Sequence, residues 1–171
     1  LDGTREFIKG TDEYTVNIAL IRAGIPVFGV VYAPALRQMY YAHIGQGAFR
    51  SIDGGEFKKI QVTASDDDHY RIVISKAHLC EATKNYIADL KAAGKQVNTL
   101  PSGSSLKFLR VAEGAADCYP RFGPTMEWDT AAAHIVAAEA GATITSVDGD
   151  PLVYNKLDLH NPGFLVKVSI V

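Results

Sequence analysis

The sequence predicts one α/β layered domain, in which an antiparallel meander is followed by strands that alternate with helices. Residues 15–60 contain short apolar and β-branched runs separated by Gly and Pro turns, which is the pattern of adjacent strands. Helical periodicity begins only beyond residue 80. A length of 171 residues with 47% hydrophobic residues fits a single globular domain.

The meander is predicted from four apolar segments and their turns. The β-branched run at 15–21 indicates a buried strand. Asp53-Gly54-Gly55 is a strong hairpin signal at the far end of the region. Between these two features the expected strands cover 26–32, 38–42 and the residues from 48 onward.

The second half is predicted to alternate helices with strands. The acidic loop at 65–69 lacks the ligand spacing of a calcium site, so we expect it to be solvated. Gly94 and Gly141 should end two of the helices. The expected helices cover 81–93, 102–114 and 128–140, and the expected extended segments cover 71–75, 96–100, 118–119, 142–145, 150–152 and 164–170.

Composition excludes several classes of function. With 17 basic and 19 acidic residues and no run of like charge, the chain is not expected to be a nucleic-acid scaffold or to carry a polybasic membrane anchor. No apolar stretch approaches the ~20 residues of a membrane span. Cys80 and Cys118 are too few for a disulfide framework, so we expect two reduced, partly buried thiols and a cytoplasmic location.

A cluster with turn and ligand chemistry stands at the start, Leu1-Asp2-Gly3-Thr4. Gly3 permits a sharp turn that a Cβ would obstruct. Such a turn can present the Asp2 carboxylate, the Leu1 carbonyl and the Thr4 hydroxyl on one side, and magnesium prefers oxygen ligands. The tripeptide is also common in plain loops, so by itself it indicates either a metal site or an ordinary turn.

Asp129 begins the small-residue helix beside Trp128. An Asp at a helix start is usually a cap. The same position also holds the carboxylate rigidly, so that it can point into a cleft, while the positive helix terminus suits a phosphate nearby. Both interpretations stay open from this motif alone.

Between these clusters lies a candidate anion site. Ser104 and Lys107 share one face of the expected helix, whose first backbone N–H groups have no helical partner. Arg121 follows the short extended segment. Together they could bind a phosphate through charge-assisted hydrogen bonds, or they could be ordinary surface residues.

Taken together, these segments resemble the inositol monophosphatase superfamily of magnesium-dependent, lithium-sensitive phosphomonoesterases. Residues 1–7 are similar to the end of its signature Asp-Pro-x-Asp-Gly-Thr-x-x-Phe, and Trp128-Asp129-x-Ala131-Ala132 is similar to its second signature. Further segments resemble its branch of 3′(2′),5′-bisphosphate nucleotidases: Ser75-Lys76-Ala77-His78, Gly103-Ser104-Ser105-Leu106-Lys107-Phe108, Tyr119-Pro120-Arg121-Phe122-Gly123-Pro124-Thr125 and Asn161-Pro162-Gly163-Phe164.

This resemblance implies the alternating α and β layers of the family and a reaction that uses two or three Mg²⁺ ions. It implies that Asp2 and Asp129 ligate one magnesium and that the Leu1 carbonyl contacts another. Thr4 would help orient the attacking water, and the backbone N–H groups of Gly3 and Thr4 would hold the phosphate that reacts. The implied reaction converts 3′-phosphoadenosine 5′-phosphate to AMP and phosphate.

The resemblance also implies substrate contacts away from the metals. Lys107 and Arg121, with Ser104, would hold the second phosphate of the small-molecule bisphosphate nucleotide, and His78 would lie near its nucleoside. A homodimer and an association with the periphery of the inner membrane are further expectations. The alternatives are an inositol monophosphatase-type enzyme with the same chemistry and a non-catalytic fragment.

The resemblance begins inside the first signature and covers about the last two thirds of such an enzyme. We therefore expect residues 1–171 to be the C-terminal two thirds of a single phosphatase domain, with its N-terminal part missing. The expected Asp-Pro before Leu1 and an upstream Glu ligand are absent from the sequence. We expect this chain alone to be inactive.

Overall fold

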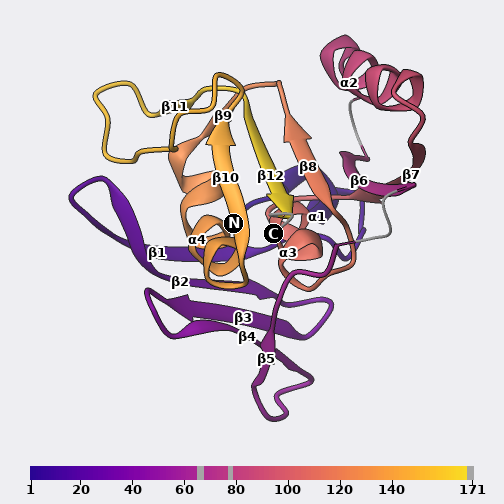
Figure 1. Cartoon of the computed structure of the whole chain (residues 1–171). Coiled ribbons are helices and arrows are strands. Elements are labelled where there is room, and N and C mark those ends of the chain that lie inside the picture. The colour runs from indigo at the N-terminus through magenta and orange to yellow at the C-terminus, as the bar shows by residue number, and fades with distance from the viewer. Residues whose placement is uncertain (65–67, 77–78, 169–171) are drawn as a thin grey trace.

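A computed structural model describes residues 1–64, 68–76 and 79–168. Two β-sheets enclose the helices α3 (Leu106–Ala112) and α4 (Glu127–Glu139), as Figure 1 shows. The helix α2 (Glu81–Ala92) lies beside the second sheet, on the side away from the first (Figure 1). The predicted α/β layered fold is therefore confirmed.

The first sheet is the predicted antiparallel meander, in which each strand pairs with the next. Asp53 and Gly54 both adopt the left-handed conformation, with φ of 55° and 71°, in the turn that the sequence signalled. The strands are β1 (Val16–Arg22), β2 (Ile25–Ala33), β3 (Gln38–His43), β4 (Gly47–Ile52) and β5 (Lys58–Ile60).

The second sheet is mixed and has the order β10-β12-β8-β6-β7. Its β6 and β7 are parallel and are joined through α2, whereas β12 is antiparallel to both β10 and β8. The strands are β6 (His69–Ser75), β7 (Gln96–Ser102), β8 (Cys118–Arg121), β10 (Ala142–Ser146) and β12 (Phe164–Val168).

Three short elements were not predicted. The helix α1 (Thr4–Ile8) is a single exposed turn with no buried residue, so it has no apolar periodicity to detect. Phe7 anchors it by an edge-to-face contact with Tyr14, at 5.1 Å between ring centres. The strands β9 (Thr125–Met126) and β11 (His160–Asn161) pair only two residues each, and their partners are far apart in sequence.

One local expectation was wrong, and another is met only in part. The helix expected over 102–114 covers only Leu106–Ala112, because β7 continues to Ser102 and Ser104 takes a left-handed conformation with φ of 52°. Helix formation cannot pass through a residue in that conformation. The segment 150–152 contributes only an isolated bridge from Pro151 to Thr145. The acidic residues Asp66 and Asp67 lie outside the described residues.

The contact between α4 and the first sheet is unusually close. Ala131, Ala132 and Ala133 are buried, and a Cβ at Gly29 of β2 would lie only 2.5 Å from the Ala132 carbonyl oxygen. Small residues on both elements therefore let backbone approach backbone. This contact holds the N-terminal end of α4, which carries Asp129, at a fixed distance from the meander.

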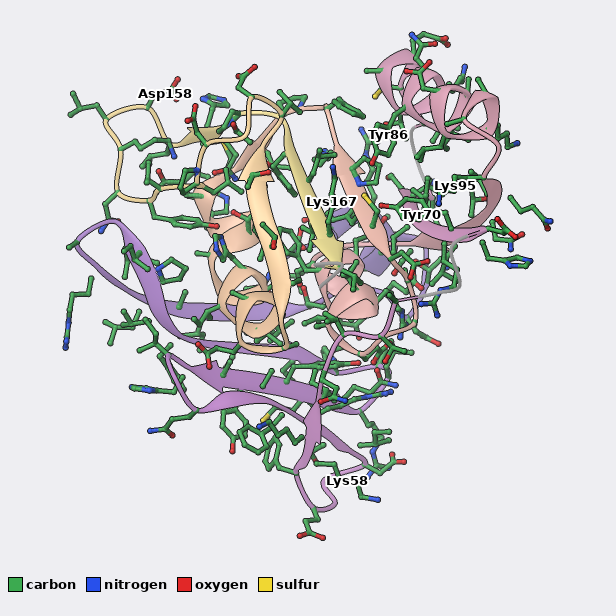
Figure 2. All side chains as sticks on the ribbon, in the orientation of Figure 1. Lys58, Tyr70, Tyr86, Lys95, Asp158 and Lys167 are labelled. Carbon is green, nitrogen blue, oxygen red and sulfur yellow. The ribbon has the colours of Figure 1, made fainter. Side chains whose placement is uncertain are left out.

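The cysteines of the described residues are free thiols. Cys118 is buried, and its sulfur lies 3.7 Å from the hydroxyl of Tyr86, whose side chain appears beside Tyr70 in Figure 2. Burial raises the pKa of the Cys118 thiol to about 11, which leaves it protonated and unreactive at neutral pH. Cys80 is exposed. No helix among the described residues is long and apolar enough to cross a membrane.

Candidate functional site

Segments that are distant in sequence meet around one cavity of about 170 Å³. The loop before α1, the start of α3, the end of β8 and the start of α4 all contribute to it. Asp2 and Asp129 both line this cavity, and so do Lys107 and Arg121. The remaining lining residues are Gly3, Glu6, Ser75, Ser104, Ser105, Phe108, Tyr119, Pro124, Thr125, Thr130 and Phe164.

Asp2 is fixed at its backbone and at its carboxylate. Its N–H donates to the Thr15 carbonyl at 2.8 Å, and the Thr15 N–H donates back to the Asp2 carbonyl at 2.9 Å. Its Oδ2 accepts from the Ser104 hydroxyl and from the Ser105 backbone N–H at 2.8 Å. The side chain therefore enters the cavity with one carboxylate oxygen already bound from the α3 side.

Gly3 makes this entry possible. It has φ of 86°, and a Cβ there would lie 3.2 Å from both the Glu13 carbonyl oxygen and the Tyr14 Cα. Both the conformation and the crowding favour glycine. Glu13 then ties the same loop to the neighbouring elements, because its Oε2 accepts from the Gly103 N–H at 2.7 Å and lies 3.0 Å from the Lys76 ammonium.

Asp129 combines the two roles that the sequence left open. Its Oδ2 accepts from the Met126 backbone N–H at 2.9 Å, so it caps the start of α4. It also lines the cavity. Burial raises the pKa of Asp129, and the negative charge of Asp2 adds to this effect. Two carboxylates thus line one cavity, an arrangement that a cation between them would stabilise.

The two cations of the cavity differ in burial. Lys107 is only 8% exposed, and its Nζ donates to the Ser104 carbonyl at 2.6 Å and lies 5.5 Å from the Tyr119 ring centre. Burial lowers the pKa of Lys107 to about 8, although the charge of Asp2 acts in the opposite direction. Arg121 is partly exposed and donates to the Gly123 and Pro124 carbonyls at 3.2 and 3.0 Å. Both can donate further hydrogen bonds to an anion.

Other predicted site residues either do not line the cavity or direct their hydrogen-bond donors to Asp2. Leu1 is 67% exposed and Thr4 is also exposed, and among the described residues neither belongs to the cavity lining. Ser104 lines the cavity, but its hydroxyl proton is directed to Asp2. The Ser105 N–H, expected as a helix-start donor for phosphate, is also bound to Asp2. His78 lies outside the described residues.

Sequence reasoning missed several residues of the site. Glu6 lines the cavity from α1, but Asp2 lies before that helix and pairs with Thr15, so no helical spacing relates Glu6 to Asp2 and no local signal identified it. Thr15 is fully buried, and its hydroxyl contacts those of Ser104 and Ser105 at 2.7 and 2.8 Å. In the sequence it was part of an apolar strand, and no local signal distinguished it.

The donor set fits magnesium in kind. Asp2 and Asp129 present carboxylate oxygens to one cavity, and Glu6 adds a third carboxylate to its wall. Within the described ranges, no group of three or more His, Cys, Asp and Glu side chains is arranged around a single metal position. The protein would therefore supply few ligands here, and phosphate and water oxygens would complete the coordination, as magnesium commonly requires.

Comparison with known families and proteins gives a consistent result. The sequence profile of the Inositol monophosphatase family matches residues 1–166. The chain is 47% identical over 169 residues to a protein named 3′(2′),5′-bisphosphate nucleotidase CysQ from Salmonella typhimurium and 48% identical to that of Escherichia coli K12. Each match covers 98% of this chain and 65% of the relative, so the chain spans slightly less than two thirds of these proteins.

Solved structures show the same likeness. The crystal structure of CysQ from Bacteroides thetaiotaomicron, described as a bacterial member of the inositol monophosphatase family, superposes with a TM-score of 0.90 at 44% identity. That match covers 98% of this chain and 67% of the other. SuhB of Mycobacterium tuberculosis follows with a TM-score of 0.74 at 28% identity, over 98% of this chain and 63% of the other.

Proposed function

The chain belongs to the inositol monophosphatase family, and from this premise we propose that it carries much of the active site of a magnesium-dependent phosphomonoesterase. The proposed reaction is the hydrolysis of 3′-phosphoadenosine 5′-phosphate to AMP and phosphate. The likeness to the CysQ nucleotidases, at 47–48% identity, supports this substrate over an inositol phosphate.

One observation carries the proposal. The cavity brings two carboxylates, Asp2 and Asp129, together with two cations, Lys107 and Arg121. Carboxylates bind metal ions and repel phosphate, whereas Lys and Arg bind phosphate directly. A cavity with both kinds of group suits a ligand that has one phosphate at the metals and another at the cations. A bisphosphorylated nucleotide meets this requirement.

A second cavity of about 380 Å³ adjoins the first and shares Ser75, Tyr119, Arg121 and Pro124 with it. Its wall is completed mainly by apolar groups, including Leu79 and Phe122. An apolar cavity beside an anion site is suited to a nucleoside. We assign the nucleoside of the substrate to this cavity, with Arg121 between the nucleoside and the metal side.

In the proposed mechanism, two or three bound Mg²⁺ ions would polarise the phosphate, lower the pKa of the attacking water and stabilise the leaving oxygen. Asp2 and Asp129 would hold the metal that they share, and Glu6 would hold water at the cavity wall. Lys107 and Arg121 would fix the phosphate that does not react. Water adds to phosphorus, the phosphorus–oxygen bond to the ribose breaks, and the ribose oxygen takes up a proton to become the 3′-hydroxyl.

Other roles implied by the family resemblance remain part of the proposal. They include a metal contact by the Leu1 carbonyl, water orientation by Thr4, and phosphate binding by the backbone N–H groups of Gly3 and Thr4. Since Ser104 donates to Asp2, we propose that it acts on the second phosphate only through Lys107, which its carbonyl holds. We also propose a cytoplasmic location and a homodimer, which light scattering would test.

The experiment compares phosphate release from 3′-phosphoadenosine 5′-phosphate and from inositol 1-phosphate over a magnesium titration. Both the 171-residue chain and the complete product of its gene are assayed. We expect the gene product to prefer the bisphosphate nucleotide and to require magnesium. Preference for inositol 1-phosphate would assign the site to the alternative enzyme class. Absence of magnesium-dependent release from both substrates would refute the proposal.

A further inference from the structure

A series of side-chain contacts links Asp2, through Ser104 and Ser105 of the cavity wall, to Thr15 and Asn17, which do not line this cavity. The Ser104 hydroxyl donates to the Asp2 carboxylate, and the Thr15 hydroxyl contacts Ser104 at 2.7 Å and Ser105 at 2.8 Å. The Ser105 hydroxyl in turn lies 2.9 Å from Oδ1 of Asn17. Thr15 is fully buried and Ser105 is 3% exposed, so the middle of this series of contacts is shielded from solvent.

The number of protons available to this series of contacts limits how its hydrogen bonds can be arranged. Four contacts link Asp2, Ser104, Thr15, Ser105 and Asn17 in sequence. An ionised carboxylate and an amide oxygen only accept, so the three hydroxyl groups would have to supply all four protons. Each hydroxyl has one proton. With the Asn17 oxygen facing Ser105, one contact between buried hydroxyl oxygens would have no hydrogen in it, which is unfavourable.

All four contacts have a proton when the oxygen and nitrogen of the Asn17 amide exchange places. The oxygen and nitrogen of an Asn side chain have nearly the same shape, and their positions follow from the hydrogen-bond network. We propose that Nδ2 of Asn17 donates to Ser105, Ser105 to Thr15, Thr15 to Ser104 and Ser104 to the Asp2 carboxylate. In this relay every contact has one proton and every hydroxyl both donates and accepts.

The relay makes Asn17 and Thr15 positioning residues for Asp2. Because each hydroxyl is polarised by the group behind it, the final bond to the carboxylate is stronger than an isolated hydroxyl bond. Oδ2 of Asp2 is then held by this bond and by the Ser105 N–H, which directs the other oxygen to the cavity. Thr15 holds the Asp2 backbone as well, through two backbone hydrogen bonds. The role in magnesium binding rests on the proposed function, whereas the direction of the relay does not.

The reverse direction is the competing arrangement. A protonated Asp2 could donate to Ser104, and the same chain could then end on the Asn17 oxygen. In that case Oδ2 of Asp2 would be a neutral hydroxyl that also accepts the Ser105 N–H at 2.8 Å. A carboxylate is a much better acceptor for two donors, so the structure favours the relay that ends on Asp2.

Side-chain NMR of the ¹⁵N-labelled 171-residue chain tests the direction. In the relay, one Nδ2 proton of Asn17 is hydrogen-bonded, and we expect it to exchange about tenfold more slowly than those of the exposed Asn98. Ser105→Ala removes its acceptor and should abolish this protection, while Asn98 stays unchanged. Equal exchange at Asn17 and Asn98 in the unmodified chain would overturn the relay.

Magnesium affinity, measured by calorimetry on the complete gene product, tests the positioning role. Thr15→Val keeps the shape of the side chain but interrupts the relay, and we expect binding about tenfold weaker, with recovery in Thr15→Ser. Asn17→Asp should also weaken binding, although it adds a negative charge. The control is Thr83→Val, which removes another buried hydroxyl, 3.3 Å from the Cys80 sulfur. Thr83 lines the second cavity and not the cavity that contains Asp2, so magnesium binding, measured without nucleotide, should not depend on it.

These outcomes distinguish a failure of the positioning role from a failure of the proposed function. Unchanged magnesium affinity in Thr15→Val, or an equal loss in Thr83→Val, would refute the positioning role. If the unmodified protein binds no magnesium, both the positioning role and the proposed function fail, while the NMR result still decides the direction of the relay.

Discussion

Replacing Gly29 by Ala should disturb the close contact between β2 and α4, which positions Asp129 at the cavity. Gly29 lies in β2 and does not have a positive φ, so alanine fits its backbone conformation. The added Cβ would nevertheless lie 2.5 Å from the Ala132 oxygen and 2.5 Å from Cγ2 of Ile135. Both distances are about 0.9 Å short of ordinary van der Waals contact, which begins at 3.4 Å.

The size of the effect follows from this overlap. A backbone carbonyl cannot rotate away as a flexible side chain can, so α4 must move from the sheet. Overpacking of this kind costs about 1–3 kcal/mol of the free energy of unfolding. For a domain of this size, that loss lowers Tm by roughly 2–12 °C. Asp129 lies in the first turn of α4, so magnesium affinity should fall together with stability.

Thermal unfolding followed by circular dichroism measures the first effect, and calorimetric magnesium binding measures the second. Gly123→Ala is the matched control, because its Cβ would be no closer than 3.7 Å to a neighbouring side-chain atom and its φ is not positive. We expect the control to melt within a few degrees of the unmodified chain. An unchanged Tm in Gly29→Ala would show that the close approach of β2 and α4 does not constrain the helix.

Three further predictions concern charged groups and are tested on the complete gene product. Asp129→Asn keeps the acceptor that caps α4 but removes the charge of a proposed metal ligand. The rate of phosphate release should therefore fall at least tenfold, or about 1.4 kcal/mol, while the melting curve changes little. Full turnover at saturating magnesium would contradict a metal role. Lys107→Ala and Arg121→Ala should each lower kcat/KM for the bisphosphate nucleotide by roughly 10- to 150-fold and leave inositol 1-phosphate nearly unaffected, and equal losses on both would place the residues at the reacting phosphate. Burial lowers the pKa of His134, which contacts the Tyr154 hydroxyl at 2.8 Å, to about 4. The pKa of His134 in the unfolded state is about 6.5, so between pH 6.5 and 4 the unfolded state binds a proton that the folded state does not. The free energy of unfolding should therefore fall by up to about 3 kcal/mol as the pH drops from 6.5 towards 4. Urea unfolding measures this loss, and an equal pH dependence in His134→Gln would show that the imidazole is already solvated in the folded protein.

The meander and the layered order were predictable because they depend on local signals. Alternating β-branched runs and the Asp53-Gly54 turn specify strands and their connection without reference to distant residues. The alanines of α4 likewise indicated a closely packed helix. Their partner could not be predicted, since Gly29 is a single glycine within an apolar strand and only the three-dimensional contact gives it meaning.

The candidate site divides in the same way. Asp2 and Asp129 were identified from short motifs, because ligand chemistry and turn chemistry occur together in a few consecutive residues. The convergence of Asp2, Lys107, Arg121 and Asp129 on one cavity depends on the packing of four elements, and the sequence indicated it only through a family resemblance. The cavity in the structure is consistent with the grouping that the resemblance implied.

What the tertiary structure alone decided is how the protons and hydrogen bonds are used. Ser104 was expected to bind phosphate, yet its left-handed backbone turns its hydroxyl to Asp2. Thr15 belongs by pattern to a buried strand, and its burial next to two serines gives its hydroxyl a structural use. Residue types determine which atoms can donate or accept, but a donor with one proton can serve one partner at a time. Which partner receives it is determined by distances between segments that are far apart in the chain.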